Sequence, residues 1–164
     1  MDERWPKVAK EFGKLVSMSD ACIIAGGAIR DHVNDRQIKD FDIYIYGPTS
    51  DCCNHVLKNY HKVSSGDYLD SGLEVYDHNA LDIQVMHIYN GSVDSNQLLM
   101  GWCQKNFDLD ICKIYYTYET GIVSYPEFNR VFKHGECNVD TNVTNEERLN
   151  RISIKYPEII FRQV

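Results

Sequence analysis

Residues 41 to 46 alternate between apolar residues and polar or tyrosine residues, and this pattern constrains the fold more than any other in the sequence. The odd positions hold Phe or Ile and point to one side of an extended chain, whereas Asp42, Tyr44 and Tyr46 point to the other side. The alternation predicts a strand with one core face and one open face. Asp40 lies at the entrance of this strand, and a Gly-Pro pair ends it.

Other patterns place helices and strands on both sides of this strand. Helices are expected at 5–17, 28–34, 51–60, 94–104 and 126–134, and a Thr-x-x-Glu capping box at Thr144 opens a last helix that runs through Ile154. Further strands are expected at 21–25, 72–76, 81–88, 106–118 and 122–124. This order predicts an α/β (α+β) domain with a mixed β-sheet, with helices packed mainly on one face and the acids on the other.

Size and charge set further limits. The 164 residues fit a single domain over 1–164. A net charge of −7, from 24 acidic and 17 basic residues, argues against strong non-specific nucleic-acid binding. None of the six cysteines has the Cys-x-x-Cys spacing of a zinc site, so we expect free thiols in a reducing compartment. No apolar run approaches the ~20 residues of a membrane span, and we expect a cytoplasmic protein.

Acidic residues mark the open face of the predicted sheet. Asp40 and Asp42 are separated by one residue in a strand, so their side chains project to the same face with Cβ atoms ~7 Å apart. Both carboxylates can then reach one divalent cation or bridge a pair, and oxygen-only ligation favours Mg²⁺ or Mn²⁺ over Zn²⁺. Asp82 is the expected third ligand, because Leu81 and Ile83 beside it take the core face of a later strand.

A glycine turn precedes these acids. Gly26 and Gly27 end a short apolar strand just before a helix, and the absence of side chains lets backbone N–H groups approach a phosphate. Arg30, one turn into that helix, can add a bidentate phosphate contact. The order of these residues predicts that a phosphate group binds beside the acids.

Taken together, Gly26-Gly27-x-x-Arg30-Asp31 and Lys39-Asp40-x-Asp42-Ile43 resemble the head-domain signature of tRNA CCA-adding enzymes and bacterial poly(A) polymerases. These enzymes belong to the DNA-polymerase-β-like nucleotidyltransferase superfamily. The resemblance covers about 20 residues, and Asp82 in a later strand extends it across the first half of the chain. It implies a nucleotidyltransferase core in which a nucleoside monophosphate passes from an NTP to an acceptor hydroxyl, releasing pyrophosphate.

The resemblance also implies roles for individual residues. Asp40, Asp42 and Asp82 would be the catalytic carboxylates that bind Mg²⁺ or Mn²⁺. The nucleotide would be held by Gly26, Gly27, Arg30 and Lys39. The acceptor would be an RNA or tRNA 3′ end, a small molecule or a protein. CCA-adding enzymes continue into helical domains for which this chain has no length, so it looks more like the short, single-domain enzymes of phages and mobile elements, which act in the host cytoplasm.

Some features allow other interpretations. Asp108 and Asp110 form a second Asp-x-Asp without a glycine turn, which favours turn or sheet-entry acids and leaves a supporting role for Asp108 open. Arg148, Arg151 and Lys155 form a basic helix face, either solvated or gripping a polyanionic acceptor. The alternative to an enzyme is a catalytically degenerate member of the same fold that binds a partner as an inhibitor or regulator.

Overall fold

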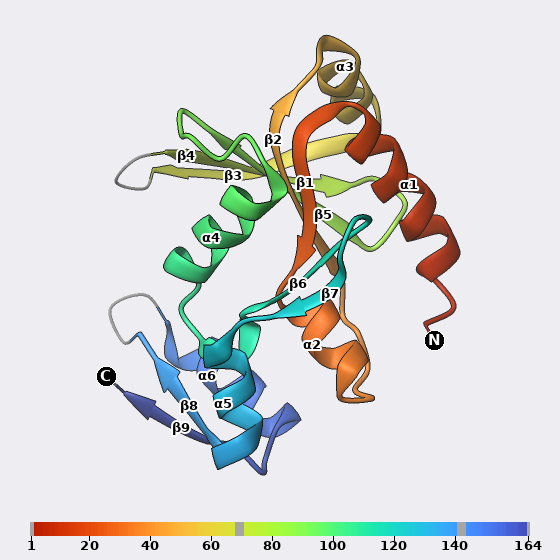
Figure 1. Cartoon of the computed structure of the whole chain (residues 1–164). Helices are drawn as coiled ribbons and strands as arrows, with labels where there is room; N and C mark the ends of the chain where they lie inside the picture. The colour runs from red at the N-terminus through yellow and green to blue at the C-terminus, as the bar shows by residue number, and fades with distance from the viewer. Residues whose placement is uncertain (1, 68–70, 141–143, 164) are drawn as a thin grey trace.

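The computed structural model describes residues 2–67, 71–140 and 144–163 (Figure 1). Seven strands form one mixed sheet in the order β3-β4-β5-β2-β1-β6-β7. In this sheet β2 and β5 run parallel, and the other neighbouring strands run antiparallel. The strands are β1 (Ser19–Ala25), β2 (Phe41–Pro48), β3 (Tyr60–Asp67), β4 (Gly72–His78), β5 (Ile83–Tyr89), β6 (Ile114–Thr117) and β7 (Gly121–Ser124).

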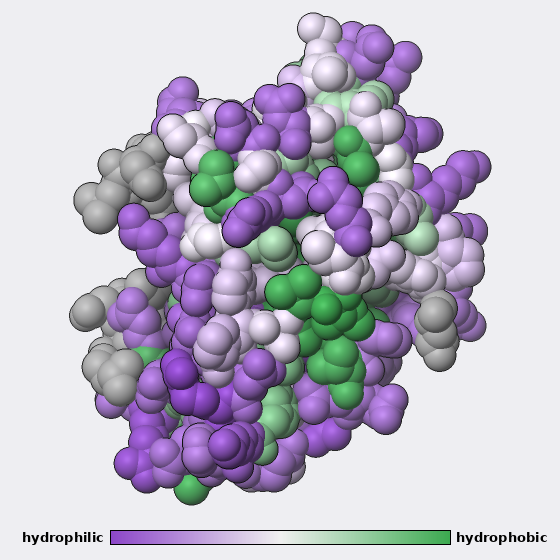
Figure 2. Space-filling model, in the orientation of Figure 1, coloured by the Kyte–Doolittle hydropathy of each residue, from purple (hydrophilic) through white to green (hydrophobic). Residues whose placement is uncertain are grey.

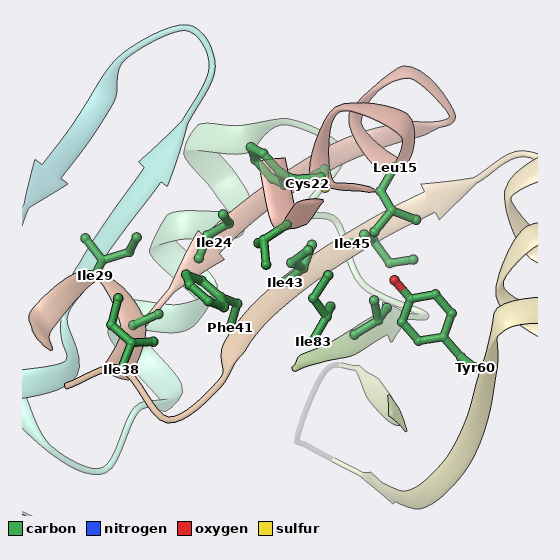
Figure 3. Packing of buried hydrophobic residues seen from close by; sticks show 14 of the residues in the cluster. Leu15, Cys22, Ile24, Ile29, Ile38, Phe41, Ile43, Ile45, Tyr60 and Ile83 are labelled. Atoms are coloured by element: carbon green, nitrogen blue, oxygen red, sulfur yellow. The ribbon is translucent and has the colours of Figure 1, made fainter. Parts of the chain in front are cut away.

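Three helices cover one face of the sheet, as the alternation in β2 requires. Phe41, Ile43 and Ile45 are buried on this face with apolar side chains of the three helices (Figure 3). A fourth helix packs on the opposite face, where Tyr44 is buried. The prediction of a mixed sheet with helices mainly on one face is confirmed. The three helices are α1 (Trp5–Ser17), α2 (Gly27–Val33) and α3 (Ser50–Asn59), and the fourth is α4 (Asn96–Asn106).

The C-terminal part of the chain forms a second, smaller hydrophobic cluster at one end of the sheet, at the bottom of Figure 1. A parallel pair of short strands lies there with two helices and a 3₁₀ turn. Figure 2 shows that this region carries a largely hydrophilic surface, whereas an apolar patch lies above it, over β7 and α2. The elements are η1 (Asp110–Cys112), α5 (Pro126–His134), β8 (Glu136–Val139), α6 (Glu146–Lys155) and β9 (Ile160–Gln163).

The prediction of one long strand over residues 106–118 is wrong. The helix α4 continues to Asn106, the 3₁₀ turn η1 follows, and a strand begins only at Ile114. The physical reason is the second cluster, in which Leu109 and Ile111 are buried apart from the main sheet. The strands β3, β8 and β9 were not predicted either.

The last helix begins differently from the capping box. Asn145, rather than Thr144, caps α6 by accepting a hydrogen bond from the backbone N–H of Arg148 at 2.8 Å. The Thr144 hydroxyl instead donates to the Asp108 carboxylate at 2.8 Å. Thr49 caps α3, and Gly135 ends α5 in the left-handed conformation. No helix in the described ranges combines the length and apolar character needed to cross a membrane.

Candidate active site

A cavity of about 550 Å³ lies on the face of β2 that carries Asp42 and Tyr44, and residues of α2, of the end of α4 and of α6 also line it. The structure brings six of the seven residues expected from the sequence to its wall; Asp82 does not line it. The cavity is lined by Gly26, Gly27, Arg30, Asp31, Lys39, Asp40, Asp42, Tyr44, Gln84, Asn106, Phe107, Asp108, Leu109, Cys112, Arg148, Arg151, Ile152 and Lys155.

The side chains of Asp42, on β2, and of Asp40, directly before this strand, differ from those of Asp31 and Asp108, which form ion pairs in the same cavity wall. Asp40 and Asp42 are half-buried, and neither carboxylate forms a hydrogen bond or ion pair with any residue that the structure describes. Burial, and then the negative charge of Asp40, raise the pKa of Asp42 to about 7 from an ordinary value of 3.8, against the opposing charges of nearby Arg and Lys side chains. Two adjacent carboxylates in this environment favour a bound cation.

The glycine pair makes room for Arg30. Gly26 has φ 80° and ψ −134°, a conformation that glycine adopts without strain, and it precedes the first turn of α2. A Cβ atom on Gly27 would lie 3.2 Å from the Arg30 Nη2 atom. A side chain at position 27 would therefore press against the guanidinium group.

Asp31 fixes Arg30 from behind. The Arg30 guanidinium donates to both Asp31 oxygens, at 2.8 and 3.2 Å. Lys155 and Tyr156 also donate to this carboxylate, at 2.6 and 2.7 Å. Burial alone would raise the pKa of Asp31, but the hydrogen bond and charge of Arg30, with the contacts from Lys155 and Tyr156, lower it below its ordinary value. Asp31 is thus a buried anion that holds two cavity cations in place.

Asp82 lies outside this arrangement. Its side chain is 61% exposed, and one of its oxygens accepts from the Arg4 Nη1 atom at 2.8 Å. Among the described residues, no group of three or more His, Cys, Asp or Glu side chains could hold a metal ion. The structure therefore does not assemble Asp40, Asp42 and Asp82 into one metal-binding group. The neighbour of Asp42 on β5 is Gln84.

Three cations on the cavity wall come from α6. Arg148, Arg151 and Lys155 are spaced by three and four residues, which places them on one face of the helix, and this face lines the cavity. That spacing was the available sequence signal, but a solvated face has the same spacing. Asp108 holds this helix: Arg148 donates to its two oxygens at 2.9 and 3.0 Å.

Aromatic and amide side chains form the uncharged part of the wall. Tyr44 and Phe107 lie with ring centroids 5.6 Å apart, and Asn106 donates to the Trp102 carbonyl at 2.9 Å. Flat aromatic rings can stack against a nucleobase. The alternation of β2 predicts that Tyr44 shares a face with Asp42, whereas no sequence pattern indicates Asn106 and Phe107, which the end of α4 brings to the cavity.

Comparison with solved structures shows the same fold in CCA-adding enzymes. The Thermotoga maritima CCA-adding enzyme complexed with tRNA_CCA has a TM-score of 0.59 at 14% identity, over 99% of this chain and 40% of that chain. The Bacillus stearothermophilus enzyme in complex with CTP has a TM-score of 0.55 at 14% identity, over 94% and 38%. The chain thus spans about two fifths of these enzymes.

Sequence comparison identifies the family. No curated protein matches the chain. A family profile described as Gabija anti-defense 2 family protein matches residues 3–134, which include every element from α1 to α5. The chain therefore belongs to the Gabija anti-defense 2 family, and it has the fold of the nucleotidyltransferase part of CCA-adding enzymes.

Proposed function

We propose that this protein transfers a nucleoside monophosphate from an NTP to an acceptor hydroxyl and releases pyrophosphate. The observation that carries the proposal is the pair of unneutralised carboxylates, Asp40 and Asp42, in one cavity with the Gly26-Gly27 turn and Arg30. The nucleotidyltransferase fold supports it.

The donor set fits Mg²⁺ or Mn²⁺. Such ions bind through one or two carboxylates together with substrate phosphates and water. Asp40 and Asp42 would hold the ion, because a cation would offset the burial and mutual repulsion that raise the pKa of Asp42. When bound, the ion would offset the negative charge of the triphosphate.

The triphosphate would meet the cationic wall. Arg30 is held by Asp31 in a fixed orientation, which reduces the entropy lost when it binds a phosphate. Lys39 and Arg151 are exposed and form no ion pair with the described part of the chain, so their charges are available to an anion. Gly26 and Gly27 leave space for the phosphate beside the backbone.

In the transfer step, the acceptor oxygen would form a bond to the α-phosphorus as the bond to the α–β bridging oxygen breaks. Pyrophosphate would leave on the side opposite the acceptor, and the hydroxyl proton would pass to water. The side chains named above would supply position and charge and form no covalent intermediate. The acceptor would be an RNA or tRNA 3′ end, a small molecule or a protein, and the family description favours a molecule of the Gabija defence in a phage host.

A second candidate function is binding without transfer. It is favoured by the pairing of Asp82 with Arg4, which leaves two unpaired carboxylates, Asp40 and Asp42, among the described residues of the cavity wall, and by the anti-defense family, whose description names no reaction. The protein would then bind a partner and inhibit or regulate it, with or without a nucleotide in the cavity.

Labelled nucleotides separate the two functions. The protein is incubated with each α-³²P NTP, Mg²⁺ and, separately, host RNA, host protein or host metabolites. Transfer predicts label on one acceptor class in the wild type and none with Asp42→Asn. Asp94→Asn, an exposed acid that does not line the cavity, serves as the control. A folded wild type that labels nothing in any pool would leave the binding function.

A further inference from the structure

We infer that the amide oxygen of Gln84, and not the carboxylate of Asp82, is the third protein ligand of the cation, so that the site holds one resident divalent ion. This inference rests on the cation site of the proposed function and adds a ligand and a stoichiometry to it. It follows from strand register, amide orientation and the contacts of Arg4.

The register places Gln84 beside Asp42. The strands β2 and β5 are parallel neighbours, and Asp42 pairs with Gln84 in this ladder. Residues paired across strands point to the same face, and neighbouring strands lie about 4.8 Å apart. The side chain of Gln84 lines the cavity together with Asp40 and Asp42. A cation bound to Asp42 would therefore lie within reach of Gln84.

A neighbouring carboxylate fixes the orientation of the amide. Gln84 Nε2 donates to the Asp77 Oδ1 atom at 2.7 Å, and a carboxylate can only accept. The nitrogen end must face Asp77, which pairs with Gln84 from β4, on the side away from β2. The oxygen end is left over, and no described residue donates to it. An amide oxygen is an ordinary ligand for Mg²⁺ and Mn²⁺.

Arg4 engages Asp82 from the other side. Its guanidinium donates to Asp2, to the carbonyls of Ile38 and Lys39, and to Asp82. These contacts anchor Arg4 at the segment that leads into Asp40, and Asp82 serves as one of its counter-ions. Arg4 occupies one of the two Asp82 oxygens, Oδ2, and the Asp82 side chain does not line the cavity.

Charge balance then sets the number of ions. Two carboxylates and one neutral amide neutralise one divalent cation. A second ion would face the positive side chains of the same wall without a further carboxylate to balance it, because Asp31 and Asp108 are already paired with Arg30 and Arg148. A second ion would therefore arrive only with the triphosphate.

Titration with Mn²⁺ alone tests this, with binding followed by electron paramagnetic resonance and calorimetry and folding checked by circular dichroism. The wild type should bind one Mn²⁺. Gln84→Met, which keeps the length of the side chain and removes the oxygen, should weaken binding about tenfold or more. Asp82→Asn should leave it unchanged.

Three further variants control for indirect effects. Gln104 also donates to a carboxylate, that of Glu127 at 2.7 Å, but does not line the cavity, so Gln104→Met should bind Mn²⁺ like the wild type. Asp77→Asn keeps an oxygen that can accept from Gln84 and should retain affinity, whereas Asp77→Leu releases the amide and should lower it.

The outcomes distinguish this inference from the proposed function. Equal Mn²⁺ affinity in folded Gln84→Met and wild type, or a loss in Asp82→Asn, would overturn the assignment of Gln84. Two Mn²⁺ ions bound without nucleotide, or none, would overturn the single resident ion. Weaker binding in Gln84→Met together with no nucleotide transfer by the wild type would sustain the inference and refute the transfer reaction.

Discussion

At the scale of single residues, Asp42 is a carboxylate in an unfavourable environment, because burial and the charge of Asp40 raise its pKa to about 7. It lies on a central strand between Ala25 and Gln84, neither of which can neutralise it. The nearest like charge is Asp40, which adds to the penalty of burial. A position that is unfavourable for folding without a ligand is typical of a functional site.

The raised pKa of Asp42 predicts a specific pH dependence of stability. The unfolded carboxyl titrates near 3.8 and the folded one near 7, so between these values the folded state binds more protons and its stability falls as the pH rises. Asp42→Asn removes this loss. In EDTA, the variant should gain stability relative to wild type between pH 4 and pH 8, by at most about 4 kcal/mol.

Urea unfolding at pH 4, 6 and 8 measures the difference, with Asp94→Asn as the exposed control. A constant difference between Asp42→Asn and wild type at all three values would show that Asp42 is not perturbed. Adding Mg²⁺ should make the wild type more stable than Asp42→Asn at pH 8, because the ion binds the wild-type carboxylate and the amide of the variant carries no charge to bind it.

The lack of a side chain at Gly27 predicts a steric effect of substitution on nucleotide binding. A Cβ at this position lies 3.2 Å from the Arg30 Nη2 atom, so Gly27→Val should displace the guanidinium and weaken NTP binding about tenfold or more. Gly101→Ala is the matched control, because its Cβ meets open space in α4. Calorimetry with a non-hydrolysable NTP gives both dissociation constants. Unchanged affinity in a folded Gly27→Val protein would contradict a role for this turn.

At the scale of elements, the sequence predicted best where one sheet determined the side-chain pattern. The alternation of β2 and the Gly-Gly break before α2 were visible because each is local. The stretch around Asp108 was not, because its buried residues serve a second cluster built from α5, α6 and β8. The alternation of residues 81–85 predicts that Gln84 shares the open face with Asp82. Its pairing with Asp42 and the position of the α6 cations depend on strand register and helix docking, which no local pattern encodes.

The docking of α6 predicts a role for Asp108 in stability. Its carboxylate is 10% exposed and accepts two bonds from Arg148 and one from Thr144. Asp108→Ala leaves these donors unsatisfied and should cost about 1–3 kcal/mol, with faster amide exchange in α6. The exposed pair of Arg162 and Glu136 is the control, because Glu136→Ala should change stability by less than about 0.5 kcal/mol. Full stability in Asp108→Ala would show that α6 is held by apolar contacts alone.

On the scale of the whole molecule, the cavity lies between the main sheet with α4 and the hydrophobic cluster of the C-terminal part. Asp40, Asp42 and Gln84 come from the main sheet, whereas Arg148 and Arg151 come from the helix that packs on the second cluster. A ligand that contacts both walls adds a link between them. Binding should therefore stabilise the molecule as a unit and protect α6 in particular.

The last prediction concerns the stabilisation by a ligand that contacts both walls of the cavity. At a concentration of Mg²⁺-NTP about 100 times its dissociation constant, the gain is about 2.7 kcal/mol, which should raise the Tm by about 5–10 °C. EDTA should remove most of this shift, because the triphosphate then lies against Asp40 and Asp42 without a cation between them.

Arg151→Ala should reduce the shift without changing the Tm of the free protein, because its exposed side chain has no ion-pair partner among the described residues. Arg130→Ala, an exposed arginine on α5 outside the cavity, should keep the full shift. If Arg151→Ala also kept the full shift while Gly27→Val lost it, the triphosphate would lie against α2 alone, and α6 would be a structural wall.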